Sequence, residues 1–160
     1  MIDVVRRTTP ADADALRSFT CSHGLWYEEE AQRFLRRGLA DGVAAGHPAW
    51  VVEADGDLVA VAAHAGVPHP DGSQRLITQV TILATRVEDD DRSWLAQGLR
   101  VSRLVQAMRA EMRIADRALY WYSVVAAENT KMCRWHERSG FIARPVPSDP
   151  RYLFFVARAD

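Results

Sequence analysis

The feature that most constrains this chain is a strand, a capped helix and a glycine stop in direct succession in its last third. Residues 118–125 read ALYWYSVV, and such a run of aromatic and β-branched residues is typical of a buried strand. Asn129 and Thr130 follow, and their side-chain oxygens can cap the start of a helix. Gly140 is expected to end that helix in a left-handed conformation, and Phe141 to begin another strand. The stretch therefore predicts a strand–helix–strand unit.

Strand and helix patterns alternate through the rest of the chain. Strands are predicted at residues 2–7, 50–54, 58–64, 76–85 and 152–157, and helices from about residue 10, over 28–45 and over 93–116. Asp55-Gly56-Asp57 predicts a tight turn between the second and third strands. Such alternation predicts a mixed sheet with helices on both faces.

Two helix faces carry specific expectations. The apolar side of helix 28–45 is expected to comprise Ala31, Phe34, Leu35 and Leu39. The helix at 93–116 is expected to turn its arginines outward, Arg100 among them.

Composition excludes several classes of protein. At 160 residues, with 48% apolar and 26% charged residues, the chain is expected to form one globular domain. A formal net charge of −1 gives no bulk attraction to nucleic acid or to an acidic membrane surface. Cys21 and Cys133 form neither a metal nor a redox motif, and no metal site is predicted. The first ten residues lack the apolar segment of a signal peptide, so a cytoplasmic location is expected.

The stretch at 129–141 resembles the C-terminal half of the GCN5-related N-acetyltransferase (GNAT) superfamily. There an Asn follows a strand, and a Tyr-Glu-Lys/Arg-x-Gly-Phe pattern comes after it. Matching positions are Asn129, Glu137, Arg138, Gly140 and Phe141, while His136 stands where the family has tyrosine. The order of predicted elements matches the family over essentially the whole chain. The resemblance implies an α/β (α+β) fold with a mixed, mostly antiparallel central sheet, in a single domain over residues 1–160, and an N-acetyltransferase activity.

The resemblance also implies that acetyl-CoA or another acyl-CoA is the acyl donor. Pantetheine would pair with the strand at 76–85 near Leu83, Ala84 and Thr85, and Asn129 would hydrogen-bond to it, although a purely capping role for Asn129 is compatible with the sequence. The pyrophosphate would lie on the loop that opens the next helix, because free backbone N–H groups and the helix dipole bind anions.

This pyrophosphate loop departs from the family pattern Gln/Arg-x-x-Gly-x-Gly/Ala, and two registers are open. In the preferred one Gly98 is the first glycine, Leu95 replaces the Gln/Arg, and Arg100 replaces the second small residue. In the other, Arg92 leads, and Leu95 and Gln97 replace both glycines. The predicted cofactor contacts here are Gln97, Gly98, Leu99 and Arg100. The Arg100 side chain is expected either to block the pyrophosphate or to bind it.

Catalysis in the resembled family needs an acid that protonates the departing thiolate, and a tyrosine commonly serves. His136 is the candidate here, because an imidazole titrates near neutral pH and can act as acid or base. The alternative is a partly buried histidine without a catalytic role. A carboxylate base is absent from the strand at 76–85, so a general base would come from Glu53, His64 or an ordered water.

The acceptor side is expected to include Trp26 and Tyr27, as the corresponding region does in the family, and Glu88 in the acidic run 88–91 would attract a cationic amine. The acceptor would be the amine of a small molecule or of a protein or peptide. A second hypothesis is a binding or regulatory module that keeps the fold and has lost CoA; a third is a related enzyme with another donor. The resemblance further implies a homodimer formed through the C-terminal strands.

Overall fold

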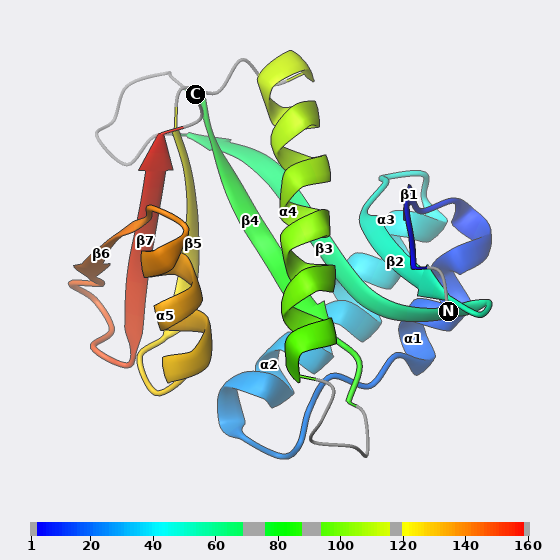
Figure 1. Ribbon diagram of the computed structural model, residues 1–160, viewed down its shortest axis with the longest axis horizontal. Helices are drawn as coiled ribbons and strands as arrows, with labels where there is room; N and C mark the ends of the chain where they lie inside the picture. Colours follow the sequence, from blue (N-terminus) through cyan, green and yellow to red (C-terminus); the bar gives the residue numbers. More distant parts are fainter. Residues whose placement is uncertain (1–2, 69–75, 88–93, 116–119, 159–160) are drawn as a thin grey trace. The chain divides into compact units, whose positions relative to one another are not determined.

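The computed structural model describes residues 3–68, 76–87, 94–115 and 120–158, and Figure 1 traces their helices and strands. The strands are β1 (Val4–Arg7), β2 (Trp50–Ala54), β3 (Asp57–Pro68), β4 (Leu76–Thr85), β5 (Tyr120–Ala126), β6 (Ile142–Pro145) and β7 (Tyr152–Arg158). The helices are η1 (Pro10–Asp12), α1 (Ala13–Ser18), α2 (Trp26–Phe34), η2 (Leu35–Leu39), α3 (Ala40–Ala44), α4 (Trp94–Ala115) and α5 (Thr130–Arg138). Glu88 and Arg92 lie outside the described residues, so their predicted roles stay predictions.

The described strands form one sheet in the order β1-β2-β3-β4-β5-β7-β6. Antiparallel pairing joins β1 to β2, β2 to β3, β5 to β7 and β6 to β7. β4 and β5 instead run parallel, with Thr78 opposite Trp121 and Gln79 opposite Tyr122. The predicted α/β fold with a mixed, mostly antiparallel sheet is therefore confirmed.

The chain divides into two compact units. Unit 1 comprises Met1–Ala63 and Ile82–Met108, and unit 2 comprises His64–Thr81 and Arg109–Asp160. The prediction of a single domain over residues 1–160 stays a prediction. Each unit is built around buried side chains of its own.

Unit 1 has an apolar core made by its helices and strands. Its buried members are Leu16, Phe19, Leu35, Leu39, Ala40, Val43, Ala49, Val51, Leu58, Val61, Ala63 and Ile82. The predicted apolar side of the second helix is right for Leu35 and Leu39 and wrong for Phe34, which is 41% exposed. The buried stripe runs from Gln32 through Leu35 to Leu39, and Phe34 lies about 100° away from Leu35 around the helix.

Gln32 is a buried polar residue that the sequence pattern did not reveal. Its Nε2 donates to the carbonyl of Phe19 at 2.6 Å, and its Oε1 accepts from the N–H of Cys21 at 2.8 Å. The amide side chain thereby supplies partners to the backbone that leaves α1, which would otherwise be buried without them. This contact ties α2 to the end of α1.

Unit 2 is built on β5, which pairs with β7 along its whole length, from Tyr120 opposite Arg158 to Ala126 opposite Tyr152. Figure 1 shows β5, β7 and β6 side by side, with α5 connecting β5 to β6. Phe155, on β7, is fully buried.

Two predicted turns are confirmed by backbone angles. Gly140, just after α5, has a φ of +86°, the left-handed conformation that closes a helix. Asp55 and Gly56, between β2 and β3, have φ values of 53° and 88°, as a two-residue hairpin of the primed type requires.

Candidate functional site

The predicted site residues are distributed over both units. Unit 1 holds the last residues of β4, the first turns of α4, and the start of α2. Unit 2 holds Asn129 and His136. The two groups are described in turn.

In unit 1, the last residues of β4 are held by neighbouring backbone. Leu83, Ala84 and Thr85 are all half-buried, and Ala84 packs against the core of the unit. Directly after the strand, the N–H of Arg86 donates to the carbonyl of Val59 at 2.8 Å. The three residues predicted to pair with pantetheine are thus part of a regular strand, and that pairing stays a prediction.

The first turn of α4 has the features that let helix N-termini bind anions. The N–H groups at the start of an α-helix have no intrahelical partner, and α4 begins at Trp94, so the amides of residues 94–96 have no acceptor within the helix. The positive end of the helix dipole lies at the same place. Leu95 and Leu99 are 60% and 56% exposed, one turn apart on the helix.

The start of α4 bears on the preferred register of the pyrophosphate loop. Gly98 lies in the second turn, where a regular helix directs its N–H to the carbonyl of Trp94. The N–H of Gly98 is therefore not among the donors that the helix start leaves without an intrahelical acceptor. Arg92, which leads the other register, lies outside the described residues, so both registers stay predictions. The cofactor contacts predicted for residues 97–100 stay predictions.

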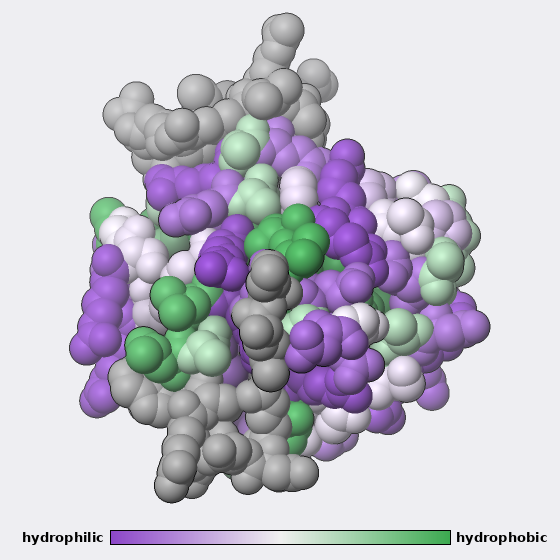
Figure 2. Space-filling view, turned by 45° about the vertical axis from the view of Figure 1, so that its right-hand side comes forward, coloured by the Kyte–Doolittle hydropathy of each residue, from purple (hydrophilic) through white to green (hydrophobic). Residues whose placement is uncertain are grey.

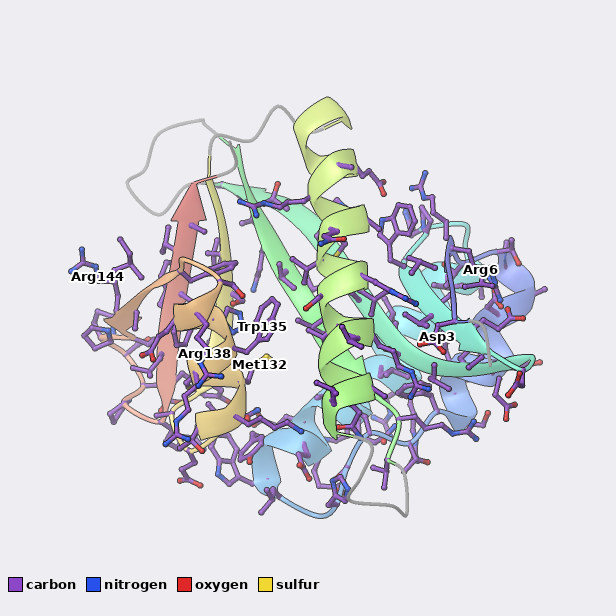
Figure 3. The ribbon with its side chains drawn as sticks, viewed as in Figure 1. Asp3, Arg6, Met132, Trp135, Arg138 and Arg144 are labelled. Atoms are coloured by element: carbon purple, nitrogen blue, oxygen red, sulfur yellow. The ribbon has the colours of Figure 1, made fainter. Side chains whose placement is uncertain are left out.

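Arg100 departs from its predicted orientation. The side chain was expected to point outward, yet Arg100 is 6% exposed, and its Nε donates to Oδ2 of Asp3 at 3.2 Å. The expectation of an outward arginine is wrong because α4 buries this side of its second turn against the residue that precedes β1. Figure 3 labels Asp3 at that end of the chain.

In unit 2, His136 is 3% exposed, and both of its ring nitrogens have partners. Nδ1 lies 2.8 Å from the carbonyl oxygen of Met132, and Nε2 lies 2.6 Å from Oγ of Ser123. A carbonyl can only accept, so Nδ1 carries the proton, and Nε2 of the neutral ring accepts from the Ser123 hydroxyl. The rings of Phe141 and Phe155 lie 4.9 Å and 4.8 Å from the imidazole.

Burial lowers the pKa of His136 from its ordinary value, and the contact with the Met132 carbonyl opposes this shift. The ring is therefore neutral at physiological pH. These contacts agree with the structural interpretation of the residue, and among the described residues they leave no ring nitrogen open toward a substrate. A catalytic role for His136 stays a prediction.

Asn129 caps α5, as predicted. Its Oδ1 accepts from the N–H of Met132 at 3.2 Å, which satisfies one of the open donors of the helix. Met132 and Trp135 follow at helical spacing, and their side chains leave the same side of α5 (Figure 3). The capping contact is present, while a contact between Asn129 and pantetheine stays a prediction.

The predicted acceptor residues Trp26 and Tyr27 open α2 and are half-buried. Their rings meet edge to face, with centroids 5.6 Å apart. Glu53, one candidate base, accepts from Nε of Arg6 at 2.8 Å.

The side chains of Cys21 and Cys133 pack within the protein and are not activated thiols. Burial raises the pKa of Cys21 to about 11, with the negative charge of Glu28 contributing. Burial also raises the pKa of Cys133, whose Sγ lies 3.7 Å from the carbonyl oxygen of Ala126. Neither thiol is a thiolate at neutral pH, as a nucleophile would have to be.

Two further findings concern the described residues alone. Within them, no cluster of histidine, cysteine and carboxylate side chains is arranged to hold a metal ion. Nor does any helix there have the length and apolarity needed to cross a membrane. Figure 2 shows hydrophobic residues scattered among hydrophilic ones on the face that it presents.

Sequence reasoning missed three participants in these contacts: Asp3, Ser123 and Gln32. Each is a polar residue whose role depends on a partner far away in the chain. The sequence offered a signal for Ser123 alone, which is a polar residue within an otherwise apolar and aromatic strand.

Comparison with known proteins gives a structural match without a sequence match. No family model matches the chain, and no curated protein matches its sequence. An N-acetyltransferase from Staphylococcus aureus Mu50 shares the fold with a TM-score of 0.70 at 13% identity, over 100% of both chains. An acetyltransferase of the GNAT family from Bacillus cereus ATCC 10987 does so with a TM-score of 0.65 at 12% identity, over 99% of this chain and 98% of that one.

A third similar structure is a mutant of the toxin AtaT bound to the C-terminus of the antitoxin AtaR. Its TM-score is 0.66 at 19% identity, over 98% of this chain and 92% of that one. At sequence identities this low, the likeness to these three structures shows the fold alone. This chain therefore has the fold of the GNAT acetyltransferases.

Proposed function

We propose that this chain is an acyl-CoA-dependent N-acyltransferase that moves an acetyl or related acyl group to an amine by direct attack. The observation that carries the proposal is the fold, which the chain shares over nearly its whole length with acetyltransferases. The helix start at residues 94–96 supports it, because a helix N-terminus suits the pyrophosphate of CoA.

In this proposal the protein contributes mainly binding and orientation. The first turn of α4 holds the pyrophosphate through backbone N–H groups, and the end of β4 pairs with the pantetheine. The acyl-CoA supplies the activated thioester, and CoA leaves as the thiol when the amide bond forms. The acceptor is a small-molecule amine or an amine of a protein or peptide, and an ordered water is its base, since Glu53 is already paired with Arg6.

A second candidate is a binding or regulatory module that has kept the fold and lost the cofactor. Two observations favour it. In the register led by Arg92, Leu95 and Gln97 stand in the glycine positions, and side chains there reduce the approach of a phosphate to the backbone. His136, at the tyrosine position, is buried.

Calorimetric titration with acetyl-CoA tests the choice, with Leu95→Glu as the informative variant. Leu95 is exposed in the first turn of α4, so a glutamate there suits the helix dipole and leaves the core untouched, yet it repels a pyrophosphate. Gln106→Glu is the matched control, because it adds the same charge at an exposed position three turns further along α4. Micromolar binding that Leu95→Glu abolishes and Gln106→Glu retains would support the enzyme.

Absence of binding by the wild-type protein would favour the module. Equal binding by both variants would place the pyrophosphate somewhere other than the first turn of α4. If binding is found, a screen of amines with detection of released CoA then identifies the acceptor class.

A further inference from the structure

A buried amide on α2 holds the segment that joins α1 to α2 in unit 1. Gln32 is 4% exposed, although its side chain is polar. Its Nε2 donates to the carbonyl of Phe19 at 2.6 Å, and its Oε1 accepts from the N–H of Cys21 at 2.8 Å. One side chain therefore satisfies the two backbone groups that flank Thr20, as a neighbouring strand would do.

Thr20, between these two contacts, bonds to the chain that leaves β4. Its carbonyl accepts from the N–H of Val87 at 2.8 Å, and the preceding N–H, that of Arg86, donates to the carbonyl of Val59 on β3 at 2.8 Å. The chain after β4 is thus held first by β3 and then by Thr20. All of these residues belong to unit 1.

Two carboxylates near the start of α2 hold the rest of the same segment. Oε1 of Glu29 accepts from the hydroxyl of Ser22 at 2.6 Å, and Oε2 of Glu28 accepts from the N–H of His23 at 2.7 Å. The segment is therefore fixed to α2, the helix that begins with the two aromatic residues predicted for the acceptor side. Through Thr20 it also connects that helix to the end of β4.

We propose that Gln32 is a positioning residue for acyl-CoA binding, which acts by keeping Thr20 where its carbonyl holds the end of β4. The inference rests on the proposed function, since it assigns pantetheine to that strand end. Without the amide, the carbonyl of Phe19 and the N–H of Cys21 would lose their partner, so the segment would shift to hydrate them. The bond from Val87 to Thr20 would then weaken, and the strand end would lose its fixed position.

The test compares Gln32→Met with the wild-type protein, because methionine has a similar length and lacks the amide. The first readout is hydrogen exchange at the N–H of Val87, which needs no ligand. The second is a pair of dissociation constants, for acetyl-CoA and for 3′-phospho-ADP, the nucleotide half of CoA that lacks pantetheine. We expect exchange about tenfold faster, acetyl-CoA binding about fivefold weaker, and binding of the nucleotide unchanged.

Thr8→Val is the matched control. Thr8 is 7% exposed, and its hydroxyl oxygen accepts from the N–H of Ala49 at 2.8 Å, so the variant also removes a buried bond between side chain and backbone in unit 1. It should lower stability to a similar degree. Exchange at Val87 and both dissociation constants should stay unchanged.

Gln32→Glu is the conservative variant, and it also covers the case in which Gln32→Met folds poorly. A neutral carboxyl can donate and accept as the amide does, whereas an ionised one can only accept. Lowering the pH should therefore restore protection of the Val87 N–H toward the wild-type value in Gln32→Glu, with each variant compared with the wild type at the same pH.

Unchanged exchange at Val87 in Gln32→Met would overturn the inference, whatever the protein binds. Faster exchange with an unchanged dissociation constant for acetyl-CoA would overturn the link to the acyl donor, and so would equal weakening of both ligands or the same weakening in Thr8→Val. A wild-type protein that binds no acetyl-CoA would refute the proposed function instead. The exchange comparison would still decide whether Gln32 holds the end of β4.

Discussion

The hydrogen bond between Ser123 and His136 leads to a prediction about stability that separates a structural histidine from a catalytic one. Both residues are nearly fully buried, and the 2.6 Å contact joins β5 to α5 within unit 2. Ser123→Ala removes the donor and leaves Nε2 of the imidazole buried without a partner. His136→Phe keeps a ring of similar shape and leaves the Ser123 hydroxyl without its acceptor.

The expected magnitudes follow from the asymmetry of buried hydrogen bonds. An unsatisfied buried polar group costs about 1–3 kcal/mol, whereas replacing both partners by apolar groups is nearly neutral. Each single variant should therefore lose about 1–3 kcal/mol of unfolding free energy, or about 2–4 °C in Tm for each kcal/mol in a chain of this size. The loss of unfolding free energy in the double variant should be smaller than the two single losses added together, by about 1 kcal/mol or more.

Urea unfolding followed by circular dichroism, on the wild type and all three variants, measures this coupling. Ser148→Ala serves as the control, since Ser148 is exposed in a turn of the same unit. Strict additivity would refute the reasoning, because independent residues cannot share a hydrogen bond. If acyl transfer is detected, a large loss of kcat in His136→Phe at unchanged activity in Ser123→Ala would show that the histidine acts on the substrate after all.

Two further predictions follow from the same unit. Since burial depresses the folded-state pKa of His136 below its ordinary value of 6.5, the unfolded chain binds more protons between these two values. The contribution of the neutral His136 ring to the free energy of unfolding is thus fully present above about pH 6.5 and falls as pH decreases toward the folded-state pKa. The urea midpoint should show this fall in the wild type and much less of it in His136→Phe. Gly140→Ala should cost about 1–2 kcal/mol, because φ is +86° and an added Cβ meets nothing within 4 Å, so only backbone strain acts. Thermal unfolding measures this loss, and an unchanged Tm would contradict it.

Local patterns predicted most of the fold. The hairpin at Asp55-Gly56, the cap at Asn129 and the stop at Gly140 were all predictable, because each depends on the conformational preference of one or two residues. Even the start of α4 followed from the sequence around residue 93. The register of the pyrophosphate loop did not, since a family pattern with missing glycines can be aligned in more than one way.

The orientation of polar side chains was much less accessible. Arg100 was expected to be solvated, yet it is buried, and a buried charge needs partners such as the distant Asp3. Gln32 is buried for a similar reason, because it supplies hydrogen bonds to Phe19 and Cys21. Phe34 is exposed although it is apolar, since its neighbour Leu35 occupies the buried stripe.

The sequence by itself determined the order of strands and helices, the turns between them and the resemblance that implied an acyltransferase fold. These properties are encoded in side-chain period and in turn residues that lie next to one another in the chain. The tertiary structure alone decided that Arg100 pairs with Asp3 and that His136 rests against Ser123. Each of these depends on residues far apart in the sequence, and the free energy of a buried charge or hydrogen bond is set by a partner that only folding brings near.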